Sequence, residues 1–107
     1  MERPLIDFLR PEKIDHLARR ADVRYGQAIY ARGGVALITE TPSRVEGWVG
    51  GLTGSVAEGG SQRRRTELFV TSQGLAWHCA GNPKNHPIFC KHCVALALAI
   101  VARSAKQ

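Results

Sequence analysis

The stretch Cys79-Ala-Gly-Asn-Pro-Lys-Asn-His-Pro-Ile-Phe-Cys90-Lys-His92-Cys93 decides how this chain folds. It holds all three cysteines of the protein and two of its four histidines, and an apolar run, residues 94–101, follows it directly. Thiolate and imidazole are the donors that Zn2+ prefers in structural sites, where four of them surround the ion as a tetrahedron. Soft ligands beside a loop and an apolar helix therefore predict a structural zinc site.

Three residues carry this prediction: Cys79, Cys90 and His92. Cys90 and His92 stand at the expected start of the last helix, residues 90–103, where the first-turn amides and the positive end of the helix dipole favour a thiolate. Cys79 ends the preceding strand and reaches them across the loop of residues 80–89. Two thiolates and neutral imidazoles would balance the charge of one divalent ion in a partly buried place.

The fourth ligand is the open part of this site. His86 is the first choice, because it lies in the loop four residues before Cys90. His78 comes second, since side chains alternate along a strand and His78 should face away from Cys79. Cys93 could turn toward the ion from the helix, although a buried cysteine commonly packs as a small apolar residue. Three ligands with a water, or no metal at all, are the remaining alternatives.

The run Phe-Cys-Lys-His-Cys-Val-Ala, residues 89–95, resembles the second half of the SWIM-type zinc finger, whose pattern is Cys-x-Cys, a variable loop and Cys-x-His. Segments at residues 25–35 and 48–51 resemble those that precede the finger in bacterial members, so the resemblance covers about residues 22–101. It implies a structural zinc ion. It also implies roles in binding DNA or proteins, often beside chromatin-remodelling-type helicases or transposases.

The chain departs from the family pattern at the Cys-x-Cys pair. If Cys79 is the second cysteine of that pair, Trp77 stands at the first position. If Cys79 is the first, Gly81 stands at the second. Only Cys79, Cys90 and His92 therefore match the family's ligands.

Two helices are expected before the strands. Pro11 suits the first helical position, where no amide hydrogen is needed, and apolar residues at helical spacing extend that helix to residue 21. Asp22 is expected to cap a second helix over residues 23–31. Gly33 is expected to end that helix, because glycine readily adopts the left-handed conformation.

Four β-strands are expected next, because runs of β-forming residues alternate with turn residues. They cover residues 35–40, 44–49, 66–71 and 75–79. Val45 and Val49 should face one side of their strand and Trp48 the other. Trp48 and Trp77 are nevertheless expected to serve the core rather than to stack on bases, since aromatic side chains mostly bury area. Residues 50–62, rich in glycine, are expected to form a loop.

The last helix, residues 90–103, is apolar on nearly all sides and is therefore expected at the centre of the fold. These elements predict an α+β fold with N-terminal helices, a small antiparallel β-meander, a zinc-binding loop and a C-terminal core helix. Residues 1–21 are expected to form a helical lead-in and residues 22–107 a SWIM-like zinc-finger domain, as one compact unit of a 107-residue chain.

The net charge of +6 is unevenly distributed along the chain. Residues 1–60 hold eight basic and eight acidic residues, whereas residues 61–107 hold seven basic residues and one acidic residue, Glu67. Charge asymmetry of this kind favours an anionic partner, most often nucleic acid. The predicted phosphate contacts are all basic residues of this half: Arg63, Arg64, Arg65, Lys84 and Lys91.

These features predict a non-catalytic zinc-binding module that binds nucleic acid, DNA rather than RNA. The alternative is a protein-interaction adaptor that docks onto a helicase, nuclease or transposase, with zinc purely structural. Cys90 and Cys93 form a Cys-x-x-Cys pair, but a redox pair of the thioredoxin kind belongs near the first strand rather than near the end of the chain. Glu67 is the one acidic residue in this half, so an enzyme would lack a general base beside the ligands.

We expect neither a membrane segment nor a small-molecule substrate. The longest apolar run is far shorter than the roughly 18–20 residues that a membrane span requires. The N-terminal residues include acidic side chains and no apolar signal segment, so we expect a cytoplasmic protein.

Overall fold

The structure is a computed structural model, and it describes residues 4–50, 64–79 and 89–105. Within these residues the chain forms three α-helices and one four-stranded antiparallel sheet. N-terminal helices come first, then the β-meander, then the C-terminal helix. The predicted α+β fold is therefore confirmed.

The elements follow one another in the predicted order. The chain begins with a short 3-10 helix, η1 (Leu5–Phe8). It then runs through α1 (Pro11–Leu17), α2 (Arg20–Ala31), β1 (Val35–Thr41), β2 (Arg44–Val49), β3 (Arg64–Thr71), β4 (Gly74–Cys79) and α4 (Lys91–Ala105). The strands lie in the order β1-β2-β3-β4, and every neighbouring pair is antiparallel. This is the simplest antiparallel topology, because each strand pairs with the one that precedes it in the chain.

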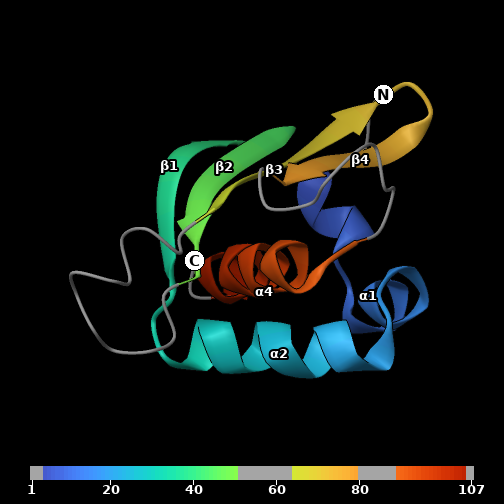
Figure 1. Cartoon of the computed structure of the whole chain (residues 1–107). Helices are drawn as coiled ribbons and strands as arrows, with labels where there is room; N and C mark the ends of the chain where they lie inside the picture. Colours follow the sequence, from blue (N-terminus) through green and yellow to red (C-terminus); the bar gives the residue numbers. More distant parts are fainter. Residues whose placement is uncertain (1–3, 51–63, 80–88, 106–107) are drawn as a thin grey trace.

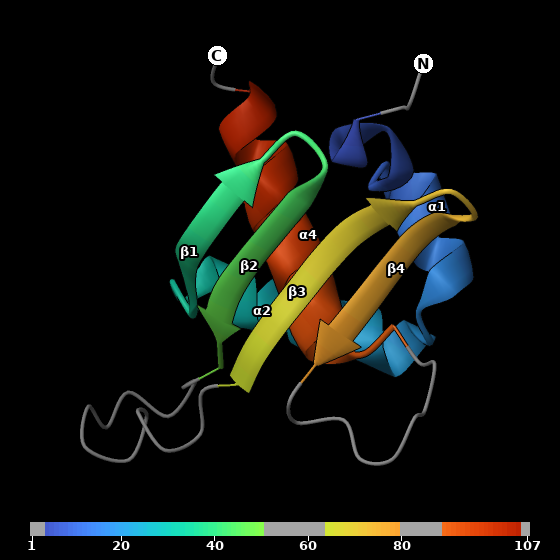
Figure 2. The same cartoon turned by 90° about the horizontal axis from the view of Figure 1, so that it is seen from above.

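The sheet, α4 and α2 form three stacked layers (Figure 1). Helix α4 lies across the inner face of the sheet, and α2 covers the side of α4 that faces away from the sheet. The described helices all lie on this side, so the opposite face, here called the outer face, is left uncovered by them (Figure 2).

Helix α4 is the centre of the hydrophobic core. Residues 93–97, five in succession, have no exposed surface. A helix can bury consecutive residues only when other elements cover it on all sides. Leu5 and Leu9, near the N-terminus, belong to the same core cluster. The prediction of a central C-terminal helix is confirmed.

Helices α2 and α4 approach one another most closely at Gly26. Asp22, Gly26 and Ile29 form the buried face of α2. A Cβ atom placed on Gly26 would lie 2.5 Å from Val94 Cβ and 2.9 Å from the carbonyl oxygen of Lys91. The missing side chain thus allows the first turn of α4 to rest directly against the α2 backbone.

The first helix ends about one turn before its predicted end. It stops at Leu17, because Ala18 and Arg19 are extended, with ψ of 150° and 153°. The chain then restarts as α2 at Arg20, so Asp22 lies in the first turn and is not the cap that we expected. Its carboxylate accepts a hydrogen bond from Arg19 Nε at 3.0 Å. The break redirects the chain so that α2 can run along α4.

The end of α2 is as predicted. Gly33 has a φ of +74°, and its N–H donates to the carbonyl of Tyr30 at 3.0 Å. The N–H of Gly34 donates to the carbonyl of Ile29 at 2.8 Å. Both carbonyls belong to the last turn of the helix, which would otherwise leave them without partners.

The two tryptophans lie in different environments. Trp48 is 44% exposed on the outer face, so the expectation of a core position is wrong for this residue. The reason is that no described helix covers that face. Trp77 points inward and is partly buried, and its ring meets that of Phe89 edge to face, with centroids 5.1 Å apart.

Candidate metal centre

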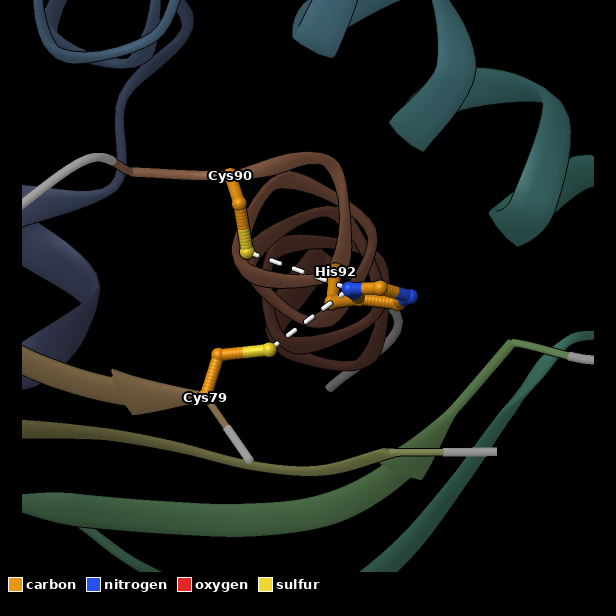
Figure 3. Close-up of side chains that lie close together, drawn as sticks. All are labelled: Cys79, Cys90 and His92. Atoms are coloured by element: carbon orange, nitrogen blue, oxygen red, sulfur yellow. Dashed lines mark hydrogen bonds between the residues drawn. The ribbon is translucent and has the colours of Figure 1, made fainter. Parts of the chain in front are cut away.

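The end of β4 and the start of α4 bring Cys79, Cys90 and His92 together (Figure 3). Their ligand atoms all lie within 4.8 Å of one another. His92 Nδ1 is 3.5 Å from Cys79 Sγ and 3.9 Å from Cys90 Sγ. The three residues that match the zinc-finger spacing therefore converge on one point from two separate elements.

These distances fit a tetrahedral metal site. With Zn–S bonds of about 2.3 Å and Zn–N bonds of about 2.0–2.1 Å, two ligands of a tetrahedron lie about 3.5 Å apart for a sulfur–nitrogen pair. The two observed sulfur–nitrogen distances, 3.5 Å and 3.9 Å, are close to this value. Two sulfurs and one imidazole nitrogen could therefore hold a metal ion with little rearrangement.

Strand pairing positions Cys79. Cys79 is the last residue of β4, pairs with Thr66 of β3 and points to the inner face, where it is 5% exposed. The Thr66 hydroxyl is fully buried and lies 3.7 Å from Cys79 Sγ and 3.3 Å from the carbonyl oxygen of Arg64, either of which can accept its proton. Our sequence reasoning missed Thr66; only its place opposite Cys79 on the neighbouring strand could have indicated it.

The start of α4 positions the other two residues. The carbonyl of Cys90 accepts the first helical hydrogen bond, from the N–H of Val94 at 3.0 Å, so the Cys90 side chain stands at the positive end of the helix dipole. Hydrogen bonds from the thiols of Cys79 and Cys93 hold the pKa of Cys90 far below its usual value. The hydrogen bond to Cys90, together with burial, raises the pKa of Cys93. The Sγ atoms of Cys90 and Cys93 lie 3.7 Å apart.

The two described candidates for the fourth ligand, His78 and Cys93, are not brought into this cluster. His78 is exposed on the outer face, opposite Glu67, whereas its neighbour Cys79 points inward. Cys93 has no exposed surface, and its Sγ lies 3.7 Å from Cys90 Sγ, but it is not part of the mutually close group. His86 lies outside the described residues. The described part of the chain thus supplies three ligands.

The predicted phosphate contacts differ in their surroundings. Arg65 forms an ion pair with Glu46, a residue that is 7% exposed: the Nε of Arg65 donates to Glu46 Oε2 at 2.6 Å, and the carboxylate balances the charge of the arginine. Arg64 is exposed, and no carboxylate among the described residues pairs with it. Lys91 lies over the ring of Tyr25, 5.6 Å from its centre. The other two, Arg63 and Lys84, lie outside the part that the structure describes.

Folding redistributes the charge that the sequence concentrates in the second half. Carboxylates of the first half pair with arginines of the second, as Glu46 does with Arg65 and Glu40 with Arg103. Arg20 and Arg24 of α2 are exposed and have no carboxylate partner within the described ranges. The unpaired positive charge therefore comes from both halves of the chain.

Comparisons with known protein families, curated proteins and solved structures give no match for this chain. The likeness of residues 89–95 to the SWIM finger therefore stays a prediction. No helix in the described part of the chain is both long enough and apolar enough to cross a membrane.

Proposed function

We propose that this protein is a small, non-catalytic zinc-binding module of the SWIM type, in which one ion joins β4 to α4. The convergence of Cys79, Cys90 and His92 carries this proposal. Two thiolates and an imidazole are a soft donor set that suits Zn2+ better than magnesium or calcium, which take oxygen ligands. His86 is the proposed fourth ligand, since the segment that contains it connects the two elements.

A structural role is favoured over catalysis. Glu46 of β2 and Glu67 of β3 lie on the outer face of the sheet, and each pairs with an arginine. No carboxylate belongs to the group of ligand atoms that the described residues bring together, so this group contains no acidic general base. The bound ion would instead hold together two segments that are thirteen residues apart, and its binding free energy would add to the folding free energy.

Metal analysis tests this proposal directly. Protein purified without added zinc should contain one zinc ion per chain, and His92→Ala should lose the ion and melt at a lower temperature. His78→Ala is the matched control, because His78 lies on the opposite face of β4 and should keep both properties. His86→Ala should lower the zinc content. Wild-type protein that stays metal-free in excess zinc, with an unchanged melting temperature, would refute the proposal.

We further propose that the module binds nucleic acid, DNA rather than RNA, and acts in the cytoplasm. The supporting observation is the set of exposed cations without described carboxylate partners, which includes Arg24, Arg64 and Lys91. Tyr25, which is 58% exposed under Lys91, adds an aromatic surface on which a base can stack. Contacts of basic residues with phosphates give affinity that falls steeply as salt is added.

Gel-shift titrations with matched DNA and RNA at several salt concentrations test this second proposal. Arg24→Ala and Lys91→Ala should each weaken binding and lower the salt slope by about one. Arg103→Ala is the control, because Glu40 already pairs with Arg103 at 2.9 Å. Binding that is absent at low salt, or that ignores salt, would rule out the phosphate surface.

A protein-interaction adaptor is the alternative, docking onto a helicase, nuclease or transposase. The uncovered outer face favours this alternative (Figure 2). Trp48 is 44% exposed on that face, and Ile38 is 46% exposed on the edge strand β1. Affinity capture after nuclease treatment separates the two functions. A partner kept after nuclease treatment and lost in Trp48→Ala supports the adaptor.

A further inference from the structure

Cys93 carries a sulfur that the proposed metal centre does not use. It has no exposed surface, and its Sγ lies 3.7 Å from Cys90 Sγ. Cys90, by contrast, is partly exposed. The two cysteines lie one helical turn apart at the start of α4, one partly exposed and one fully buried.

We propose that Cys90 and Cys93 form a disulfide when a peroxide reaches the site, and that this oxidation releases the metal ion. The release rests on the proposed metal centre, whereas the disulfide rests on the geometry of the two sulfurs alone. The Cys-x-x-Cys pair is thus an oxidation site beside the metal ligands, and its substrate class is hydrogen peroxide or an organic hydroperoxide.

The chemistry needs only the two sulfurs and one peroxide. The Cys90 thiolate attacks hydrogen peroxide, the O–O bond breaks, and Cys90 sulfenic acid forms with release of hydroxide. The Cys93 sulfur then attacks the sulfenic sulfur, a disulfide forms, and the sulfenic oxygen leaves as water with the Cys93 proton. Two electrons pass from the sulfurs to the peroxide, which is reduced to water and hydroxide.

The geometry favours this pairing over the alternatives. A disulfide needs the sulfurs to close from 3.7 Å to about 2.05 Å, which rotation of two side chains on one helical turn can supply. Cys79 comes from a different element, β4, where the buried hydroxyl of Thr66 lies against its sulfur. Cys79 Sγ also lies within 4.8 Å of Cys90 Sγ, but it remains a ligand of the proposed ion, so Cys93 is the sulfur left to resolve an oxidised Cys90.

Metal release follows from the loss of one donor. A disulfide sulfur carries no thiolate charge, so oxidised Cys90 no longer balances the charge of a divalent ion. Only Cys79 and His92 of the described ligands would then remain, and two ligands hold zinc far less tightly than a complete tetrahedral set. Reduction of the disulfide would restore the thiolate and the site.

Peroxide titration of the metal-loaded protein tests the proposal. Zinc release is followed with a chromogenic chelator, and the sulfurs are mapped by peptide mass spectrometry. Wild type should release its zinc in step with a Cys90–Cys93 disulfide, and dithiothreitol with fresh zinc should restore full metal content. In Cys93→Ala, Cys90 should proceed to sulfinic acid, so reduction should not restore the metal.

Several results would overturn this inference. A Cys79–Cys90 disulfide in the mapped wild type is one, and metal loss without any disulfide is another. Zinc missing from untreated Cys93→Ala, when Cys93→Ser also lacks it, would make Cys93 a ligand instead. If wild type binds no zinc, the metal centre itself fails; peroxide treatment of that protein then still decides whether the Cys90–Cys93 disulfide forms.

Discussion

Substitution of Gly26 by alanine tests the contact that holds the start of α4 in place. In an exposed helix this change normally stabilises a protein by about 1 kcal/mol, because alanine has the higher helix propensity. Gly26 lies in the interior of α2, so propensity alone predicts a more stable protein. The packing against α4 predicts the opposite.

The size of the effect follows from the space at Gly26. The new Cβ would lie 2.5 Å and 2.6 Å from two atoms of Val94, and 2.9 Å from the carbonyl oxygen of Lys91. Val94 is fully buried and β-branched, so its side chain cannot turn away, and the helix itself has to shift. Overpacking of a core costs about 1–3 kcal/mol, and subtraction of the propensity gain of about 1 kcal/mol leaves a net loss of up to about 2 kcal/mol.

Urea and thermal unfolding with saturating zinc measure this loss. The melting temperature should fall by about 4–8 °C for each kcal/mol. Gln27→Ala is the matched control, because Gln27 is the next residue of α2 and is exposed, and its effect should stay within about 0.5 kcal/mol. Zinc affinity should fall as well in Gly26→Ala, since Lys91 stands between Cys90 and His92. A Gly26→Ala variant that is about 1 kcal/mol more stable than wild type, as helix propensity alone predicts, would refute the packing argument.

Three further predictions concern the site and its surroundings. In the metal-free protein, the lowered pKa of Cys90 keeps this residue a thiolate at pH values below the usual thiol pKa of about 8.5. Iodoacetamide should therefore modify Cys90 at about pH 6 and leave the buried Cys93 unmodified, and mass spectrometry of the labelled peptides measures both. Thr66→Val should lower zinc affinity about tenfold in competition with a chelator, because it removes a hydroxyl that supports the Cys79 sulfur, and Thr66→Ser should retain most of the affinity. Arg65→Ala should lower the free energy of unfolding, measured in urea, by about 1–2 kcal/mol because it leaves the buried Glu46 carboxylate unpaired. Arg64→Ala should weaken nucleic-acid binding without a change in stability. Equal stability losses in the two variants would contradict the assigned pairing.

Features that depend on local pattern could be predicted from the sequence. The all-round apolar run of residues 94–101 could only suit a buried helix, and α4 is the core. Alternation along β2 correctly placed Val45 and Val49 on one face and Trp48 on the other, although the core position expected for Trp48 was wrong. The Cys-x-His spacing at the start of α4, with Cys79 at the end of a strand, also sufficed to select the three residues that converge.

Features that depend on contacts between distant segments could not be predicted. The break at Ala18 and Arg19 carries no glycine or proline, and its cause is the path of α2 along α4. Gly26 looked like an ordinary helical position until Val94 was seen against it. The pairing of Arg65 with Glu46 joins residues nineteen positions apart, so a run of three arginines gave no indication of which charge is free.

The same distinction explains why three ligands could be selected and the fourth could not. Cys79, Cys90 and His92 belong to regular elements whose directions are set by the register of β4 against β3 and by the contact of α4 with Gly26. Residues on such elements reach their places without the ion, so their spacing alone carries the geometry. His86 belongs to the connection between these elements and lies outside the described residues, so neither the register of β4 nor the contact at Gly26 indicates its place. We therefore expect His86→Ala to weaken zinc binding while leaving the sheet and α4 intact, whereas His92→Ala removes a ligand that folding has already positioned.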